Sequence, residues 1–406
     1  MIYEGRWSRW VSRRGPSVAP ASPPVRRGPS VAPATPPVRR GTMPPVHFVG
    51  PRRRGLATVA TVATVGAAAL AGLAASSVAA HGPVPAEPPD LANLFLGWSF
   101  EPVLVLPLLA AAVAWWRLLA SADRAHPGHP VATLRRWSFL AGLVAIAVAL
   151  QSGIERYDTT LFSVHMVQHL LLTLVAPPLL ALGAPVTQLL RAASPATRAR
   201  WILPILRSRP VAVLSHPVVA WLVFVSVMWA SHFSPLFDWS LEDPLAHDLE
   251  HLLFLGSAVL FWWPAVALDP APRRMGHPGR MLYLFLQMPQ NSFLAMAILF
   301  AGGPLYPHYA SLGSAYGIDA LADQRLAAGL MWFVGDAIFV AALLAVLAGW
   351  MRSEDRGAVA AERRADVERG RIREREALLR RRRAGMGGPD PDPFDQPGTG
   401  EASSSR

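Results

Sequence analysis

Cysteine and lysine are both absent from this 406-residue sequence, and charged residues of all kinds make up only 16% of it. The lack of cysteine excludes disulfides, thiolate metal sites and a cysteine nucleophile, so any soft-metal ligand must be histidine or methionine. A soluble domain carries about 25% charged residues. Here hydrophobic residues reach 52% and gather in blocks of about 20, the length that crosses a bilayer core. We therefore predict an all-α membrane protein and not a large soluble helical one.

Motifs of hydrolytic catalysis are missing as well. The sequence contains no HExxH, no recognisable pair of catalytic carboxylates and no nucleophile motif. A metal-dependent membrane enzyme is therefore the least favoured interpretation, and we expect no enzymatic activity and no catalytic residues.

Arginine alone carries the basic excess of the chain, whose formal net charge is +11. Such an excess can indicate binding to nucleic acid, but the arginines cluster at the two ends of the chain and in alternate loops. The loop after residue 183 holds Arg191, Arg198, Arg200, Arg207 and Arg209 and no acid, whereas the loop after residue 236 is acidic. This alternation is typical of membrane orientation. It predicts the lipid bilayer as partner, no nucleic acid, and a cytoplasmic C-terminus.

Seven apolar segments form the predicted membrane domain, residues 90–352. Their approximate ranges are 102–121, 137–153, 162–183, 217–236, 249–268, 280–302 and 327–351. An eighth segment, 56–80, follows three arginines and is either a signal segment or an extra transmembrane helix. The predicted fold is an all-α, polytopic transmembrane helix bundle with seven core helices plus this possible N-terminal helix or signal segment.

The two ends of the chain differ from this domain in composition. Residues 1–55 are rich in proline and arginine, and Arg13–Val25 recurs almost unchanged as Arg26–Val38. Such a repeat cannot bury a core and is expected to be disordered. It is either a tail near anionic lipid or precedes a true translation start at Met43. Residues 353–406 are predicted to form a charged cytoplasmic helix followed by a disordered tail.

Histidines carry the candidate site. His165 and His169 are four residues apart, as are His247 and His251, so each pair shares one helix face with Cβ atoms about 5–6 Å apart. Both pairs open helices that begin on the predicted extracytoplasmic side. Two imidazole pairs at equal depth would supply three or four nitrogens to one metal ion. The soft Met166 beside the first pair is a further candidate ligand.

Other interpretations of these histidines remain open, namely proton handling and structural hydrogen bonding. His232 and His308 are also predicted to lie outside, which makes six extracytoplasmic histidines. Asp248 and Glu250 lie within the second pair and are expected to face water rather than orient the imidazoles. Copper fits the donor set, but zinc fits histidine equally well, and affinity order alone does not separate the two metals.

Polar and proline residues also occur at membrane depth. Asp336 lies about ten residues into the last segment, and ionisable groups there usually face a bundle interior or a cavity. Gln287, Gln290 and Asn291 form a cluster expected to make interhelical hydrogen bonds. The Pro177–Pro178 pair should break or kink its helix.

Three motifs, in order, resemble the signature of one family. They are His165–Leu172 running into Ala176–Pro185, His247–His251 followed by Phe261–Pro264, and Asp323–Gln324 followed by Gly329–Trp332. Together they resemble the caa3-type cytochrome c oxidase assembly factor family of bacterial multi-pass membrane proteins, also called the CtaG family. The resemblance covers roughly residues 90–352, and its specificity comes from the combination of the three motifs.

The resemblance implies a seven-helix plasma-membrane protein that is needed to assemble an active haem–copper terminal oxidase, with oxidase subunits as partners and a link to copper insertion. Our hypothesis is that His165, His169, His247 and His251 bind copper transiently, with Met166 as a soft ligand. A haem-binding redox protein with axial histidines, a metal-ion transporter and a scaffold without metal remain alternatives. The sequence does not indicate an oligomeric state.

Overall fold

The computed structural model describes residues 85–312 and 315–385 of the chain. Within these residues all regular structure is helical, and no strand occurs. The elements are α2 (Leu91–Leu96), α3 (Pro102–Ala125), α4 (Thr133–Gln151), α5 (Gly153–Tyr157), α6 (Phe162–Leu170), the π-helical η2 (Leu171–Val175), α7 (Ala176–Leu182), α8 (Pro185–Ala192), α9 (Pro195–Thr197), the π-helical η3 (Arg198–Ile202), α10 (Leu203–Leu206), α11 (Arg209–Leu214), α12 (Pro217–His232), α13 (Leu236–Glu242), α14 (Pro244–Val266), α15 (His277–Leu299), α16 (Pro307–Ser311), the 3₁₀ turn η4 (Ala315–Gly317) and α17 (Ala320–Gly385). The predicted N-terminal repeat, the segment 56–80 and the tail beyond residue 385 lie outside the described residues.

Six helices in the described part of the chain are long and apolar enough to cross a membrane. They are Pro102–Ala125, Thr133–Tyr157, Phe162–Ala192, Pro244–Val266, His277–Leu299 and Ala320–Gly385. A seventh span results if α12 and α13, which meet at a bend of 67°, are counted together. Each of the seven predicted segments coincides with one of these spans, so the all-α membrane bundle is confirmed.

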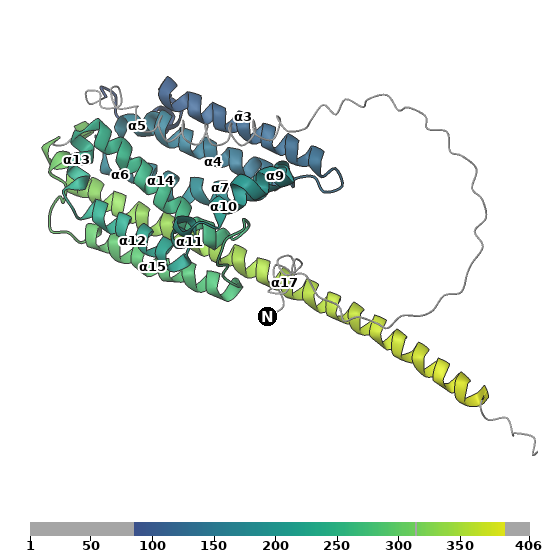
Figure 1. Cartoon of the computed structure of the whole chain (residues 1–406). Helices are drawn as coiled ribbons and strands as arrows, with labels where there is room; N and C mark the ends of the chain where they lie inside the picture. Colours follow the sequence, from purple (N-terminus) through teal and green to yellow (C-terminus); the bar gives the residue numbers. More distant parts are fainter. Residues whose placement is uncertain (1–84, 313–314, 386–406) are drawn as a thin grey trace, which may run out of the picture. The chain divides into compact units, whose positions relative to one another are not determined.

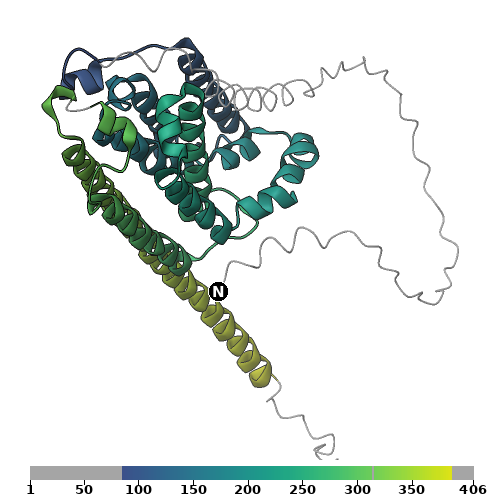
Figure 2. The same ribbon diagram turned by 90° about the vertical axis from the view of Figure 1, so that its left-hand side faces the viewer.

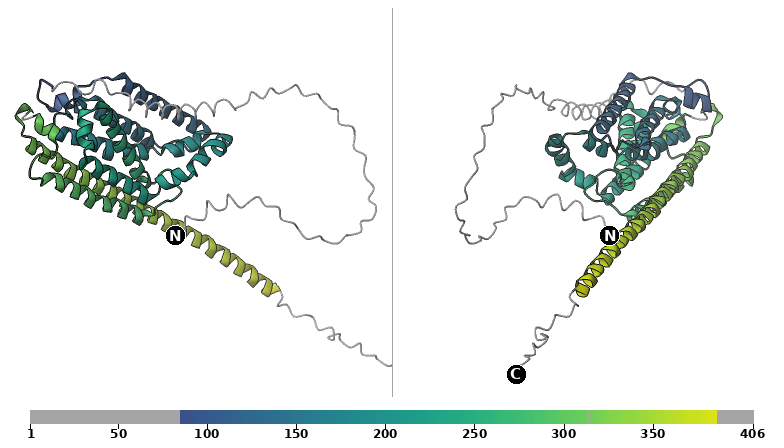
Figure 3. Two further views of the ribbon diagram at one scale, coloured as in Figure 1. Left: turned by 60° about the vertical axis from the view of Figure 1, so that its left-hand side comes forward. Right: turned by 90° about the vertical axis from the view of Figure 1, so that its right-hand side faces the viewer.

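Helices distant in the sequence pack side by side in the bundle. The membrane-spanning part of α17 packs along α15 and α6, and α14 packs against α12 (Figures 1 and 2). Past Met351, α17 continues as the same helix (Figure 3). Its side chains there are exposed at nearly every position. The charged helix predicted after residue 353 is therefore an uninterrupted extension of the last membrane helix.

Pro177 and Pro178, which were predicted to break or kink their helix, do not break it. The helical path continues through them, with a π-helical turn over Leu171–Val175 just before. Proline has no N–H, so the carbonyl of Thr173 loses the donor that residue 177 would otherwise supply. Trp262 of α14 donates its indole Nε1–H to that carbonyl at 2.9 Å. A side chain from a neighbouring helix thus satisfies the backbone group that the prolines leave unpaired.

A close backbone contact fixes the short helix α5. A Cβ atom at Gly153 would lie 2.0 Å from the carbonyl oxygen of Asn93, so α2 and α5 approach to a distance that only glycine permits. Ser152 caps α5 by accepting a hydrogen bond from the N–H of Ile154. This packing buries Glu155, which lies on α5 with only 7% of its surface exposed.

The polar cluster predicted at membrane depth joins α15 to α17. Asp336 accepts hydrogen bonds from Asn291 Nδ2 at 3.1 Å and from Ser292 Oγ at 2.9 Å. Asn291 Nδ2 also donates to the carbonyl of Met331 at 3.1 Å. The interhelical bonding expected for Asn291 is therefore observed, and it supplies partners for the carboxylate of Asp336.

Candidate metal centre

The four predicted histidines converge in the interior of the bundle. Within each pair the ring centroids are 4.1 Å apart for His165 and His169, and 4.2 Å apart for His247 and His251. Between the pairs, His165 lies 5.7 Å from His247 and His169 lies 6.4 Å from His251. None is more than 5% exposed. The i, i+4 spacing on α6 and α14 thus brings four imidazoles together.

Carboxylates divide these histidines into two donor groups. We call the first the His165 group, consisting of His165, His169 and Glu250, and the second the His247 group, consisting of Glu155, Asp158, His247 and His251. Within each group one ligand atom per residue lies within 4.8 Å of all the others, and every member is buried. Nitrogen and oxygen donors at this spacing match the ligand sets of copper, zinc and related divalent ions.

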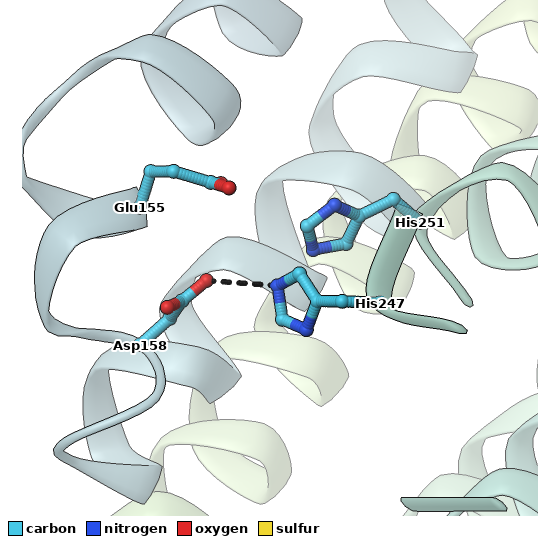
Figure 4. Close-up of side chains that lie close together, drawn as sticks. All are labelled: Glu155, Asp158, His247 and His251. Carbon is cyan, nitrogen blue, oxygen red and sulfur yellow. Dashed lines mark hydrogen bonds and ion pairs between the residues drawn. The ribbon is translucent and has the colours of Figure 1, made fainter. Parts of the chain in front are cut away.

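Hydrogen bonds connect the members of the His247 group, directly or through Gln168, and Figure 4 shows the one between Asp158 and His247. His247 Nε2 donates to Asp158 Oδ2 at 3.1 Å. Gln168 of α6 donates its Nε2–H to Glu155 Oε2 at 2.6 Å, and its Oε1 accepts from His251 Nε2 at 3.0 Å. Through these contacts α5, α6 and α14 are joined by buried polar side chains.

Two residues of α16 complete the surroundings of Asp158. Tyr309 donates its hydroxyl to the Asp158 carbonyl at 2.7 Å. Burial, and secondarily the negative charge of Asp158, raise the pKa of the Tyr309 phenol well above its usual value, so the phenol remains a donor at neutral pH. His308 Nε2 contacts the carbonyl of Thr159 at 2.8 Å and belongs to neither donor group. His308, one of the six histidines predicted to lie outside, therefore stabilises the loop next to the site by a hydrogen bond.

The His165 group lacks such internal bonds. Both ring nitrogens of His165, both of His169 and Oε1 of Glu250 have no hydrogen-bond partner among the described residues. The other Glu250 oxygen, Oε2, accepts from Ser240 Oγ at 2.7 Å. A buried polar atom without a partner costs about 1–3 kcal/mol, and native proteins rarely leave one unsatisfied. These five atoms lie close together, and a bound cation would supply the partner that they lack. The His165 group therefore fits a metal ion.

Aromatic rings form the walls around these donors. Phe237 of α13 lies 5.0 Å from the ring of His165, and Phe254 of α14 lies 4.1 Å from the ring of His169. Both phenylalanines are fully buried. An apolar wall excludes water and so strengthens the interaction of the donors with any ion that they bind.

The prediction that Asp248 and Glu250 face water is wrong. They are only 8% and 6% exposed, respectively. For Glu250 the cause is α13, which follows the bend after α12 and packs against α14, so that Ser240 covers the carboxylate of Glu250. Helix α14 also begins at Pro244, before the predicted residue 249, because Asp243 caps it by accepting from the Ala246 N–H at 2.8 Å.

Met166 and His232 lie next to the donor groups, and His232 belongs to neither of them. Met166 is 2% exposed and packs in an apolar cluster with Phe162 and Leu294. The ring of His232, at the end of α12, lies 6.1 Å from that of His169. The predicted role of Met166 as a soft ligand stays a prediction.

Three residues of this site were not predicted from the sequence: Glu155 and Asp158 of the His247 group, and Gln168, which bridges that group to α6. Of the three, only Gln168 lies within one of the three sequence motifs. One signal was available, because the two acids are three residues apart in a short loop that directly precedes the first histidine pair.

Comparison with known proteins shows to which family the chain belongs. A family model described as cytochrome c oxidase caa3 assembly factor matches residues 112–353. Uncharacterised proteins of Mycobacterium bovis and Mycobacterium tuberculosis are each 30% identical over 289 residues, which cover 70% of this chain and 43% of the relative. A protein of Mycobacterium leprae, also uncharacterised, is 30% identical over 287 residues, with 69% and 43% covered. The chain thus spans about 43% of the length of these relatives. No solved structure matches the chain significantly.

Proposed function

We propose that this chain, which belongs to the cytochrome c oxidase caa3 assembly factor family, assists the assembly of a haem–copper terminal oxidase by binding copper transiently in its buried histidine cluster. The ligands are His165, His169, His247 and His251, and Met166 is a candidate soft ligand. The observation that carries the proposal is the set of buried nitrogens of His165 and His169, which have no hydrogen-bond partner in the described part of the chain and lie next to the carboxylate of Glu250.

The chemistry of the donors supports a carrier of copper. Imidazole and carboxylate bind divalent copper more tightly than the other first-row divalent ions. A site without thiolates releases its ion more readily than a cysteine cage, which suits a protein that passes copper on. The loop charges predict that the cluster lies towards the outer face of the plasma membrane, so oxidase subunits exposed on that side are the proposed partners. In this role the chain acts as a metal-binding helper and not as an enzyme.

Purified full-length protein provides the direct test. We expect the variant His165→Ala/His169→Ala to bind Cu(II) at least about 100-fold more weakly than wild type, because loss of two ligands exceeds the 10–100-fold typical for losing an outer partner. The measurement is a competition titration together with the metal content of the purified protein. The matched control is His126→Ala/His129→Ala, which removes two histidines of a distant loop. Equal copper affinity in both double variants would reject the histidine site.

A deletion strain tests the role in assembly. We expect the deletion to lower terminal oxidase activity and the haem a signal of the membranes, and wild type to restore both. Rescue by wild type but not by an equally expressed His165→Ala/His169→Ala protein would support assembly through the site. Rescue by both would retain the assembly role and reject the metal mechanism. Normal oxidase in the deletion strain, without a substituting homologue, would reject the assembly role itself.

A further inference from the structure

A small chamber lies beside His169, between α6, α12, α15 and α17. It has about 30 Å³ of free space, enough for a single water-sized occupant. Its lining includes three methionines, two histidines and one buried glutamine, namely Met166, Met228, Met331, His169, His232 and Gln287. These thioether sulfurs distinguish the chamber from the imidazole and carboxylate donors of the histidine cluster.

The three methionines come from three different helices. Met166 lies on α6, Met228 on α12 and Met331 on α17. Met166 and Met331 are buried, with 2% and 5% of their surface exposed. Methionine often serves as an apolar gap filler, but three thioethers around one small space also form a soft donor set of the kind that selects Cu(I). In a chain without cysteine, this is the softest set available.

His232 is oriented so that it presents a lone pair. Its Nδ1 lies 2.8 Å from the carbonyl oxygen of Met228, which can only accept a hydrogen bond, so the proton of the neutral ring lies on Nδ1. Nε2 then carries the lone pair, is buried and has no hydrogen-bond partner among the described residues. A backbone carbonyl that fixes one imidazole nitrogen while the other binds metal is the usual arrangement in metalloproteins.

Two further polar groups on the chamber lack partners. The ring nitrogens of His169 and Oε1 of Gln287 are buried and unpaired among the described residues. His169 is also a member of the His165 group. It therefore lies at the boundary between that group and the chamber, within reach of an occupant of either.

We propose that this chamber is a second metal site, selective for Cu(I), in which Met166, Met228 and Met331 supply thioether sulfurs and Nε2 of His232 supplies a nitrogen. The proposal rests on the proposed function for its cargo, copper. It adds the oxidation state of the copper and a second site beside the His165 group. His169 and the candidate ligand Met166 lie at both sites.

Charge favours a monovalent ion here. The methionine, histidine and glutamine side chains are neutral, whereas the His165 group includes the carboxylate of Glu250. The cost of moving an ion from water into a low-dielectric interior rises with the square of its charge, and an uncompensated buried charge is strongly unfavourable. Neutral soft donors therefore suit Cu(I), and the carboxylate-bearing group suits Cu(II).

The test compares Cu(I) and its redox-inert analogue Ag(I) with Cu(II), each titrated against full-length protein in detergent, with Cu(I) handled anaerobically. We expect Met228→Leu/Met331→Leu to weaken Cu(I) and Ag(I) binding by about 10-fold or more and to leave Cu(II) binding unchanged. Leucine nearly conserves the volume of methionine, so the fold should be retained. The control Met288→Leu/Met296→Leu changes two methionines of α15 that do not line the chamber. X-ray absorption of the Cu(I)-loaded wild type should show sulfur neighbours.

The outcomes separate this proposal from the proposed function. Wild type that binds Cu(II) but neither Cu(I) nor Ag(I) would mean that the chamber holds only water, which overturns the proposal and leaves the proposed function intact. Cu(I) binding without sulfur neighbours, or with equal affinity in both methionine variants, would also overturn it. Loss of Cu(II) binding in His165→Ala with Ag(I) binding retained would support two separate sites. Wild type that binds no copper in either state would reject both. If the double variant does not fold, Met331→Leu and the wild-type absorption spectrum decide.

Discussion

The two donor groups contain the same kinds of residue and differ in how their polar atoms are satisfied. In the His247 group, Asp158 pairs with His247 and Gln168 links Glu155 to His251. In the His165 group, five buried nitrogen and oxygen atoms have no partner among the described residues. Helices α6 and α14 thus carry residues of both kinds. Some belong to a hydrogen-bonded network that holds its members in place, and others are donors that remain available for a ligand.

This difference indicates a division of roles. Gln168 lies between His165 and His169 on α6, and its side chain is bonded to residues of α5 and α14. The His247 group therefore positions the helix that carries the available histidines, as outer residues do around a binding site. The His247 group is expected to contribute mainly to stability, and the His165 group mainly to affinity for metal.

The largest expected effect on stability follows from Asp158→Ala. The substitution leaves His247 buried without the carboxylate that it contacts at 3.1 Å, and breaking a buried ion pair in this way costs about 3–5 kcal/mol. We expect a clear fall in the unfolding temperature of the purified protein, measured in detergent by circular dichroism.

The matched variant is His165→Leu in the other group. It removes two unpartnered nitrogens from the interior, so its effect on stability should be small or favourable, whereas copper affinity should fall. A larger loss of stability from His165→Leu than from Asp158→Ala would reverse the division of roles.

A smaller effect is expected from Gln168→Leu. The change removes the acceptor of His251 and the donor to Glu155, and a buried group left without its partner costs about 1–3 kcal/mol. Copper affinity should also fall about 10-fold, because α6 loses contacts that position it. Unfolding and copper titrations measure the two effects.

The control for this prediction is Gln188→Leu. Gln188 is also fully buried but lies on α8, where its side chain accepts from Arg191. It should affect stability without affecting copper affinity. Equal copper affinity in Gln168→Leu and wild type would show that the network does not position the donors.

The membrane fold could be predicted because its signals are local. An apolar run long enough to cross a bilayer predicts a helix from composition alone. All seven segments coincide with helices that are long and apolar enough to cross a membrane, one of them the bent pair of α12 and α13. The continuation through Pro177 and Pro178 could not be predicted in the same way. It depends on the indole of Trp262, 89 positions from Thr173 in the sequence.

The histidines of the site could be predicted because their signal is also local, whereas the carboxylates could not. The spacing of His165 and His169 fixes a shared helix face, so convergence of the two pairs could be expected. The carboxylates could not be assigned, because the burial of Glu250 depends on α13 turning back over α14, and the contact of Asp158 with His247 joins two distant segments. Loop charges indicate a side of the membrane, but they do not show which of those charges fold inward.

The smallest effect is expected from Ser240→Ala, which removes the hydrogen bond that holds the carboxylate of the His165 group. Ser240 Oγ donates to Glu250 Oε2 at 2.7 Å, so Ser240→Ala should cost about 1 kcal/mol of stability and weaken Cu(II) binding about 10-fold by releasing a ligand carboxylate. The control is Ser257→Ala, which removes an equally buried hydroxyl from α14 that donates to the carbonyl of Phe254. Glu250→Gln should weaken Cu(II) binding more than Ser240→Ala, because it removes the charge itself. If neither change at Ser240 nor at Glu250 alters copper affinity, the carboxylate is not a ligand, and the imidazoles of His165, His169, His247 and His251 bind the ion without it.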